Sequence, residues 1–260
     1  MNRPSPFVPL ATSLSVLTLL LALAAASPSF AQWPPEVKSL EVLPQDTPFR
    51  ELMGTMRGFT SALGVRCQHC HVGEEGMPLD QFDFASDERP AKERARAMLR
   101  MTAAINSDHL AKLGVEGGAL EVECVTCHRG TTRPERLADV LVRTASEDGI
   151  EAALAGYREL RADYHGSGTY DFSEVSLIAS AEELLGKGGA EAAVRLLELN
   201  LEHHPESDWT RQTLAVAYEQ AGRTGDALAV WRKILEENPG NSRVEQQIKR
   251  LSSLEEEDAP

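Results

Sequence analysis

Apolar residues recur every three or four positions along much of the chain, which is the spacing of amphipathic helices. One apolar stripe lies before the first cysteine and is followed by Gly64; its members are Leu52, Met56, Phe59 and Leu63. A second stripe lies before the third cysteine; its members are Met98, Met101 and Ile105. Beyond residue 145 the chain is rich in Ala, Leu and Glu, and we predict a helix from Ile150 to Tyr164. The patterning as a whole predicts an all-α fold.

The second half of the chain also repeats itself with a period of 34 residues. The paired positions are Leu184 and Tyr218, Gly188 and Gly222, Ala193 and Ala227, Leu197 and Trp231, Leu201 and Leu235, and Pro205 and Pro239. The alanines let two helices approach closely, and the prolines end each second helix because proline has no backbone N–H. This period and its residues resemble the tetratricopeptide repeat, which implies stacked helical hairpins.

All four cysteines lie in two short motifs, CQHCH at residues 67–71 and CVTCH at residues 124–128. On a helix, Cys67, Cys70 and His71 share one face. Two thiols can then add to the vinyl groups of a haem while the imidazole reaches its iron, and C-x-x-C-H is the c-type haem attachment pattern. We therefore predict two covalently bound c-type haems. The predicted thioether residues are Cys67, Cys70, Cys124 and Cys127, and the predicted proximal iron ligands are His71 and His128.

Three other uses of the cysteines fit less well. Two C-x-x-C pairs can bind zinc, but 53 residues separate Cys70 from Cys124, whereas the usual spacing between such pairs is about 15–20. Disulfides form in oxidising compartments, yet they do not call for a histidine after each pair. A thioredoxin-like redox pair needs a βαβ context that the patterning lacks.

The second axial ligand decides whether a haem iron is open to small molecules or closed. Methionine or histidine closes it, and a Met/His pair raises the reduction potential. Each haem motif follows a predicted helix that carries two methionines: Met53 and Met56, then Met98 and Met101. Two such pairs favour ligation, although methionine in a helix is also an ordinary core residue.

Three segments resemble, in the same order, the cytochrome subunit of photosynthetic reaction centres and its shorter relatives. They are MRGFTSALGVRCQHCHVG, RAMLRMTAAINSD and VECVTCHRGTTRP, and the resemblance covers about residues 44–137. It implies that Met56 and Met98 are the distal iron ligands, with Met53 and Met101 as second choices.

The chain also departs from that family. The photosynthetic subunit carries four haems, and this chain has two motifs. In HLAKLG, Lys112 stands where the resemblance leads us to expect a histidine ligand for a distant haem, so we expect none to be ligated from there. The appended repeats are foreign to the photosynthetic subunit, so a photosynthetic role does not follow.

The N-terminus resembles an export signal. Arg3 precedes an apolar run from Leu14 to Ala26 that is too short for a membrane span of about 20 residues, and Ser29 to Ala31 suits a signal peptidase. An uncleaved anchor is the alternative. Without residues 1–31 the chain has 25 basic and 40 acidic residues, a net charge of −15. This balance argues against nucleic acid, which binds Lys and Arg, and favours partners with a basic surface.

Together these features predict a periplasmic dihaem cytochrome c that carries single electrons between redox partner proteins. A repeat domain would dock a protein or peptide, and no segment after the signal is expected to cross a membrane. The alternatives are a haem enzyme or gas sensor with one five-coordinate iron, or a haem-bearing assembly scaffold. The predicted boundaries are 1–31 for the signal peptide, 32–145 for the dihaem domain, 146–254 for the repeat domain and 255–260 for an acidic tail.

Overall fold

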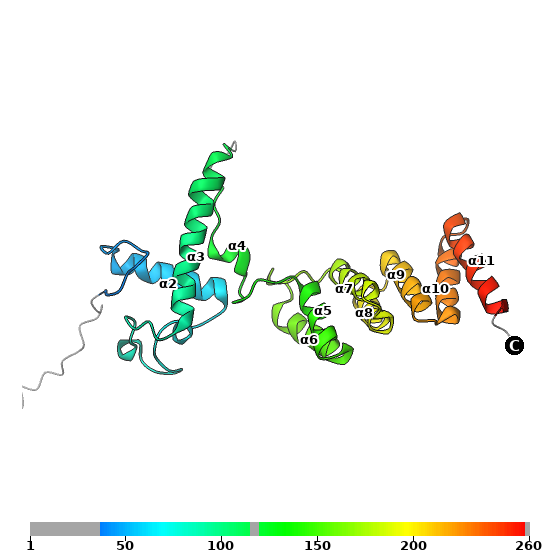
Figure 1. Ribbon diagram of the computed structural model, residues 1–260, viewed down its shortest axis with the longest axis horizontal. Coiled ribbons are helices and arrows are strands. Elements are labelled where there is room, and N and C mark those ends of the chain that lie inside the picture. The colour runs from blue at the N-terminus through cyan, green and yellow to red at the C-terminus, as the bar shows by residue number, and fades with distance from the viewer. Residues whose placement is uncertain (1–36, 115–119, 258–260) are drawn as a thin grey trace, which may run out of the picture. The chain divides into compact units, whose positions relative to one another are not determined.

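The computed structural model describes residues 37–114 and 120–257 (Figure 1). Every regular element in these residues is helical, and their one β-type pairing is an isolated bridge between Val72 and Asp83. The predicted all-α fold is therefore confirmed. The predicted signal peptide lies outside the described residues, as do the last three residues of the predicted tail. Across the described ranges, no helix has both the length and the apolar character needed to cross a membrane.

The chain divides into two compact units. Unit 1 holds residues 37–56 and 66–104, and unit 2 holds residues 57–65 and 105–257. Helix α2, Phe49–Leu63, contributes to both units. The predicted boundary near residue 145 stays a prediction, and helix α5, Leu137–Glu147, runs across it.

Unit 1 is built around helix α3, Pro90–Ala104. Proline suits the first turn of a helix because its fixed φ is helical and the N–H it lacks would be unsatisfied there anyway. Two short 3₁₀ turns, Cys67–His69 and Leu79–Gln81, complete the unit. After α3 the chain enters unit 2 through a π-helical turn, Ile105–His109, and a 3₁₀ turn, Leu110–Lys112. Both predicted methionine helices, α2 and α3, are thus confirmed.

Unit 2 contains a stack of helices in which α5 packs against α6 and α7, and each helix from α7 onward packs against the next (Figure 1). Their bounds are α6 Ile150–Tyr164, α7 Glu174–Gly186, α8 Ala190–His203, α9 Asp208–Gln220, α10 Thr224–Glu237 and α11 Ser242–Glu257. The helix predicted from Ile150 to Tyr164 is confirmed. Helix α11 runs three residues into the predicted tail.

The 34-residue period corresponds to two successive hairpins, α7–α8 and α9–α10. Ala193 and Ala227 are fully buried at equivalent places, as a close helix approach requires. The turns also match, because the Gly189 amide donates to the Leu184 carbonyl and the Arg223 amide donates to the Tyr218 carbonyl, each at 2.8 Å. These paired bonds confirm that the period marks a structural repeat.

Candidate haem-attachment sites

The first motif lies on a single tight turn in unit 1. Cys67–His69 forms a 3₁₀ turn, and the His71 amide donates to the Cys67 carbonyl at 3.0 Å. The first motif was expected to lie on a helix, but only this single turn forms between Val65 and the loop that follows. That turn still carries Cys67, Cys70 and His71 close together. Both thiols are free and partly buried.

His71 lies in an apolar setting. Its ring meets the ring of Phe84 edge to face, with centroids 5.0 Å apart. Its Nδ1 atom is buried without a hydrogen bond of normal geometry. Burial lowers the pKa of His71, the charge of Lys92 lowers it further, and the backbone of Phe84 opposes both effects. The imidazole is therefore held neutral, the form that binds iron.

The second motif forms helix α4, Cys124–His128, in unit 2. The Thr126 hydroxyl caps its start by accepting from the Glu123 amide at 3.0 Å, which satisfies a donor that the helix leaves unpaired. Cys124 is partly buried and Cys127 is exposed, and both are free. Burial raises the pKa of the Cys124 thiol, and the nearby charge of Glu123 adds to the rise.

His128 has a fixed orientation. Its Nδ1 atom lies 2.9 Å from the carbonyl oxygen of Thr131. Because a carbonyl only accepts, Nδ1 carries the proton and Nε2 is free to bind a metal, as in most metal-ligating histidines. The Thr131 hydroxyl donates to the His128 carbonyl at 3.0 Å and so closes the same turn.

The turn after this motif is tied to two other segments of unit 2. Arg129 adopts a left-handed conformation with φ of 49°, and its carbonyl accepts from the Thr169 hydroxyl at 2.6 Å. The Gly130 amide donates to the Ala62 carbonyl, near the end of α2, at 2.8 Å. A side chain at Gly64 would overlap the Gly130 carbonyl. The end of α2 therefore helps to fix the turn that holds His128.

The segment before the second motif is held by a side chain that the sequence did not single out. The Asn106 amide group donates to the Val122 carbonyl at 3.0 Å and accepts from the Val122 amide at 2.8 Å. This two-way bond anchors the extended chain two residues before Cys124. It comes from the π-helical turn after α3, which no sequence pattern predicted.

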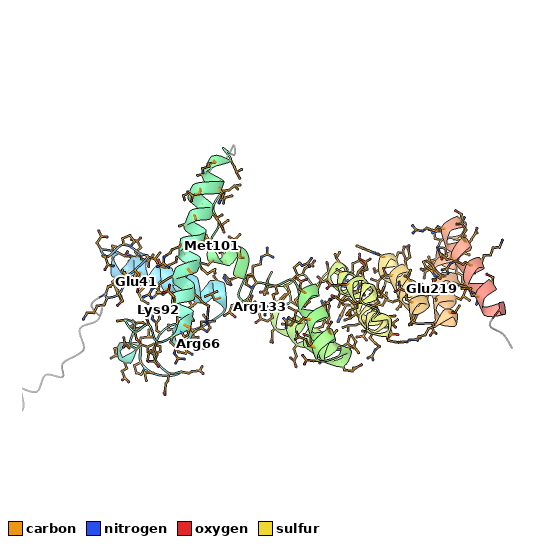
Figure 2. The ribbon with its side chains drawn as sticks, in the orientation of Figure 1. Glu41, Arg66, Lys92, Met101, Arg133 and Glu219 are labelled. Atoms are coloured by element: carbon orange, nitrogen blue, oxygen red, sulfur yellow. The ribbon has the colours of Figure 1, made fainter. Side chains whose placement is uncertain are left out.

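The structure places the candidate methionines on helices, as expected. Met53 and Met56 are partly buried on α2, and Met56 belongs to the same unit as His71. Met98 and Met101 are 40% and 45% exposed on α3 (Figure 2 labels Met101). Because Met98 lies in unit 1 and His128 in unit 2, their pairing stays a prediction.

These residues fit a covalently attached haem. Two free thiols and an imidazole lie at each motif, and His128 presents Nε2. The exposed apolar side chains of Leu120, just before the second motif, and Val125, within it, suit an apolar macrocycle. In the part of the chain that the structure describes, no three His, Cys, Asp or Glu side chains gather to hold a metal ion by themselves. A haem bound here would supply an iron that gains and loses one electron.

Comparison with known proteins agrees with this chemistry. The family described as photosynthetic reaction centre cytochrome C subunit matches residues 21–159, more than half of the chain. The chain belongs to this family. Its membership implies covalently attached c-type haem. A tetratricopeptide repeat family matches residues 184–250, from the last residues of α7 through α8, α9 and α10 into α11.

Two relatives match the cytochrome part. Cytochrome c-554 of Chloroflexus aurantiacus is 41% identical over 69 residues, which are 26% of this chain and 14% of that protein. The photosynthetic reaction center cytochrome c subunit of Rubrivivax gelatinosus is 30% identical over 92 residues, 31% of this chain and 23% of that protein. The chain thus spans less than a quarter of the length of either relative.

Proposed function

We propose that this protein is a periplasmic dihaem cytochrome c that carries single electrons between protein partners. The first haem would be attached at Cys67 and Cys70 with His71 on its iron. The second would be attached at Cys124 and Cys127 with His128 on its iron. The observation that carries the proposal is the pair of free-thiol turns, each ending in a histidine, within a cytochrome c family.

We propose Met56 and Met98 as the distal iron ligands, with Met53 and Met101 as second choices. The partly buried position of Met56, in the unit that contains His71, supports the first assignment. The exposed thioether of Met98 can bind a group brought against α3. A soft thioether favours the ferrous state and so raises the reduction potential. With both axial positions filled by protein, the irons would exchange electrons and bind no substrate.

The residues of the chain have separate tasks in this role. The thioethers would hold each macrocycle in a small fold. The Thr131 carbonyl would keep the His128 proton on Nδ1, so that Nε2 stays available to iron. Phe84 would shield the His71 ring from water on the side where the two rings meet.

The repeats would dock a partner. Residues 146–254 contain 19 acidic and 11 basic residues, whereas residues 32–145 contain 17 and 14. The acidic excess therefore lies mainly in the repeat half. Because opposite charges steer association and speed encounter, we propose that the partner presents a basic surface. The signal-like residues 1–31 and their predicted cleavage support a periplasmic location.

The optical spectrum of protein made in a host that matures c-type cytochromes tests this function. It would be recorded oxidised, reduced, and reduced with carbon monoxide. Two low-spin haems that ignore carbon monoxide support electron transfer. A carbon monoxide shift in half of the haem would mean one open iron and would favour an enzyme or gas sensor.

A further inference from the structure

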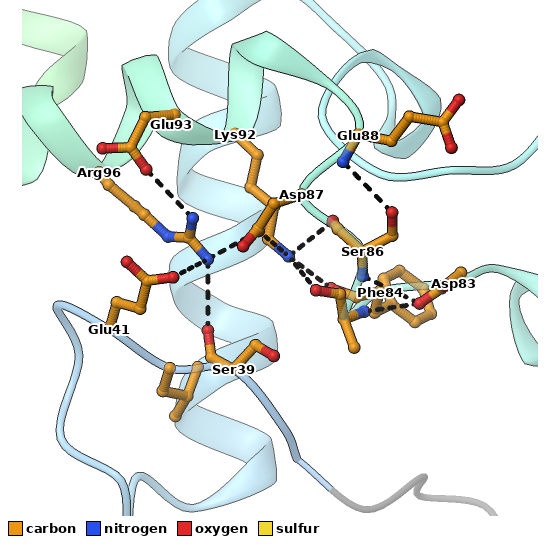
Figure 3. Close-up of polar contacts among 12 residues, drawn as sticks. Ser39, Glu41, Asp83, Phe84, Ser86, Asp87, Glu88, Lys92, Glu93 and Arg96 are labelled. Atoms are coloured by element: carbon orange, nitrogen blue, oxygen red, sulfur yellow. Dashed lines mark hydrogen bonds and ion pairs between the residues drawn. The ribbon is translucent and has the colours of Figure 1, made fainter.

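A loop in unit 1, residues 83–87, is gathered by the ammonium group of one lysine (Figure 3). Lys92, on α3, donates to the carbonyl oxygens of Phe84 at 2.9 Å, Ala85 at 3.0 Å and Ser86 at 2.9 Å. It also pairs with the Asp87 carboxylate at 3.0 Å. Three consecutive carbonyls thus converge on one cation, which fixes the path of the backbone between them.

Arg96, one helical turn further along α3, holds the same loop from its far end. Its guanidinium pairs with Asp87 at 2.8 Å and with Glu41 at 3.0 Å (Figure 3). The Lys92 side chain is only 12% exposed, whereas Asp87 is 50% exposed. Water screens the exposed carboxylate more than the enclosed ammonium, so the positive charge of Lys92 is not fully cancelled.

The loop contacts the first haem motif at Val72 and His71. The Asp83 amide donates to the Val72 carbonyl at 2.9 Å, beside the haem motif. Phe82 and Phe84 stack with centroids 5.6 Å apart, and Phe84 meets the His71 ring edge to face. Phe82 also lies so near Gly73 that a Cβ there would come within 2.5 Å of its ring. The orientation of the His71 ring therefore depends on where the loop places Phe84.

We propose that Lys92 is a positioning residue for the iron bound by His71: it holds Phe84 against the imidazole and places a positive charge beside it. This inference rests on the proposed dihaem function. The charge should raise the reduction potential of the first haem, because the ferrous form carries one positive charge fewer than the ferric form. The fixed Phe84 ring should set the plane of the imidazole. At the second motif the printed polar contact of the His128 ring is with the Thr131 carbonyl instead.

Lys92→Met tests the proposal, because it keeps the aliphatic stem and removes the charge and its hydrogen bonds. Haem content is measured first, and then both reduction potentials are measured by spectroelectrochemistry. We expect the one-electron equilibrium constant of one haem to fall about tenfold, which is about 59 mV, while the other haem is unchanged. Lys92→Arg, which keeps the charge, should retain most of the potential. Lys249→Met on α11 makes the same change in net charge and should move neither haem.

Phe84→Leu separates positioning from charge. It keeps the carbonyl that Lys92 binds and removes the ring against His71. We expect the ferric electron paramagnetic resonance g values of one haem to change while its potential shifts much less than in Lys92→Met. If the Lys92→Met protein cannot be produced, Phe84→Leu alone tests the positioning role, and unchanged g values would then overturn the proposal.

Two further results would overturn the inference: a Lys92→Met protein with two haems and unaltered potentials, or equal shifts in both haems. Failure of the proposed function is visible separately. A wild-type protein with fewer than two haems would contradict the dihaem function before any potential is compared.

Discussion

Gly64 is the residue whose replacement should most directly disturb the second haem site without touching a ligand. It follows α2 with φ of 65°, and a Cβ there would overlap the Gly130 carbonyl. A left-handed conformation costs a non-glycine residue about 1–2 kcal/mol. Moving Gly130 away would also weaken the 2.8 Å bond from its amide to the Ala62 carbonyl, worth about 0.5–1.5 kcal/mol. Gly64→Ala should therefore destabilise the protein by about 1.5–3.5 kcal/mol.

The assay is thermal unfolding of the holoprotein, where this loss should lower the Tm by roughly 3–14 °C. Gly58→Ala is the matched control, because Gly58 lies within α2 and a Cβ there meets nothing within 4 Å. Alanine in a helix interior should stabilise by about 0.5–1 kcal/mol. Gly64→Ala should also make carbon monoxide binding to the second haem easier, because moving Gly130 shifts the turn that holds His128. A Gly64→Ala protein as stable as wild type, with Gly58→Ala unchanged or better, would refute the proposed contact.

Three further predictions concern single side chains. Thr131→Val removes the hydroxyl that closes the His128 turn and should weaken the hydrogen bond from Nδ1 to the Thr131 carbonyl. A weaker bond makes the imidazole a poorer electron donor to iron, so the reduction potential of one haem should rise. Thr131→Ser should restore the wild-type potential, and an unchanged potential of both haems in Thr131→Val would contradict this role. Leu197→Ala leaves a cavity at a fully buried position in the repeat core and should lower the free energy of unfolding in denaturant by about 2–5 kcal/mol. The control Val216→Ala, at an exposed position, should change it by less than about 0.5 kcal/mol. Equal effects of the two substitutions would disprove the packing of Leu197. Burial, and then the hydrogen bond to Glu198, raise the pKa of Tyr218 from 10.0 to about 12. The stability that protonated Tyr218 contributes is therefore fully present below pH 10 and is lost as the pH rises toward 12. In Tyr218→Phe, the free energy of urea unfolding should no longer fall over this pH range because of this group.

Local patterns predicted the elements that repeat or alternate regularly. The stripe containing Met56 and the 34-residue period through Ala193 and Ala227 gave correct helices, because burial of one helical face imposes a spacing on the residues that fill it. The extent of α5 was not predicted. Its buried Leu137 and Leu141 pack into the repeat core and lie at helical spacing, but the Gly130–Pro134 segment just before it favours a loop and hides where the helix begins.

Of the haem sites, only the cysteines and histidines that would bind haem could be predicted from the sequence. The cysteines and histidines stand in contiguous motifs, whereas the residues that orient them act across a turn or across the fold. Asn106 reaches Val122 over 16 positions, and Lys92 gathers backbone carbonyls that any loop sequence would provide. Backbone acceptors leave no mark in side-chain patterns, so the positions of Phe84 and Thr131 beside the histidines needed the structure.

The most direct test of the central claim is the intact mass of the mature protein, made with c-type cytochrome maturation and measured under denaturing conditions. We predict the polypeptide mass plus two haems, since thioether bonds survive denaturation. Replacing Cys67 and Cys70 together with alanine should leave one haem, and replacing Cys124 and Cys127 should leave the other. A mass with one haem or none in the wild-type protein would contradict the dihaem account.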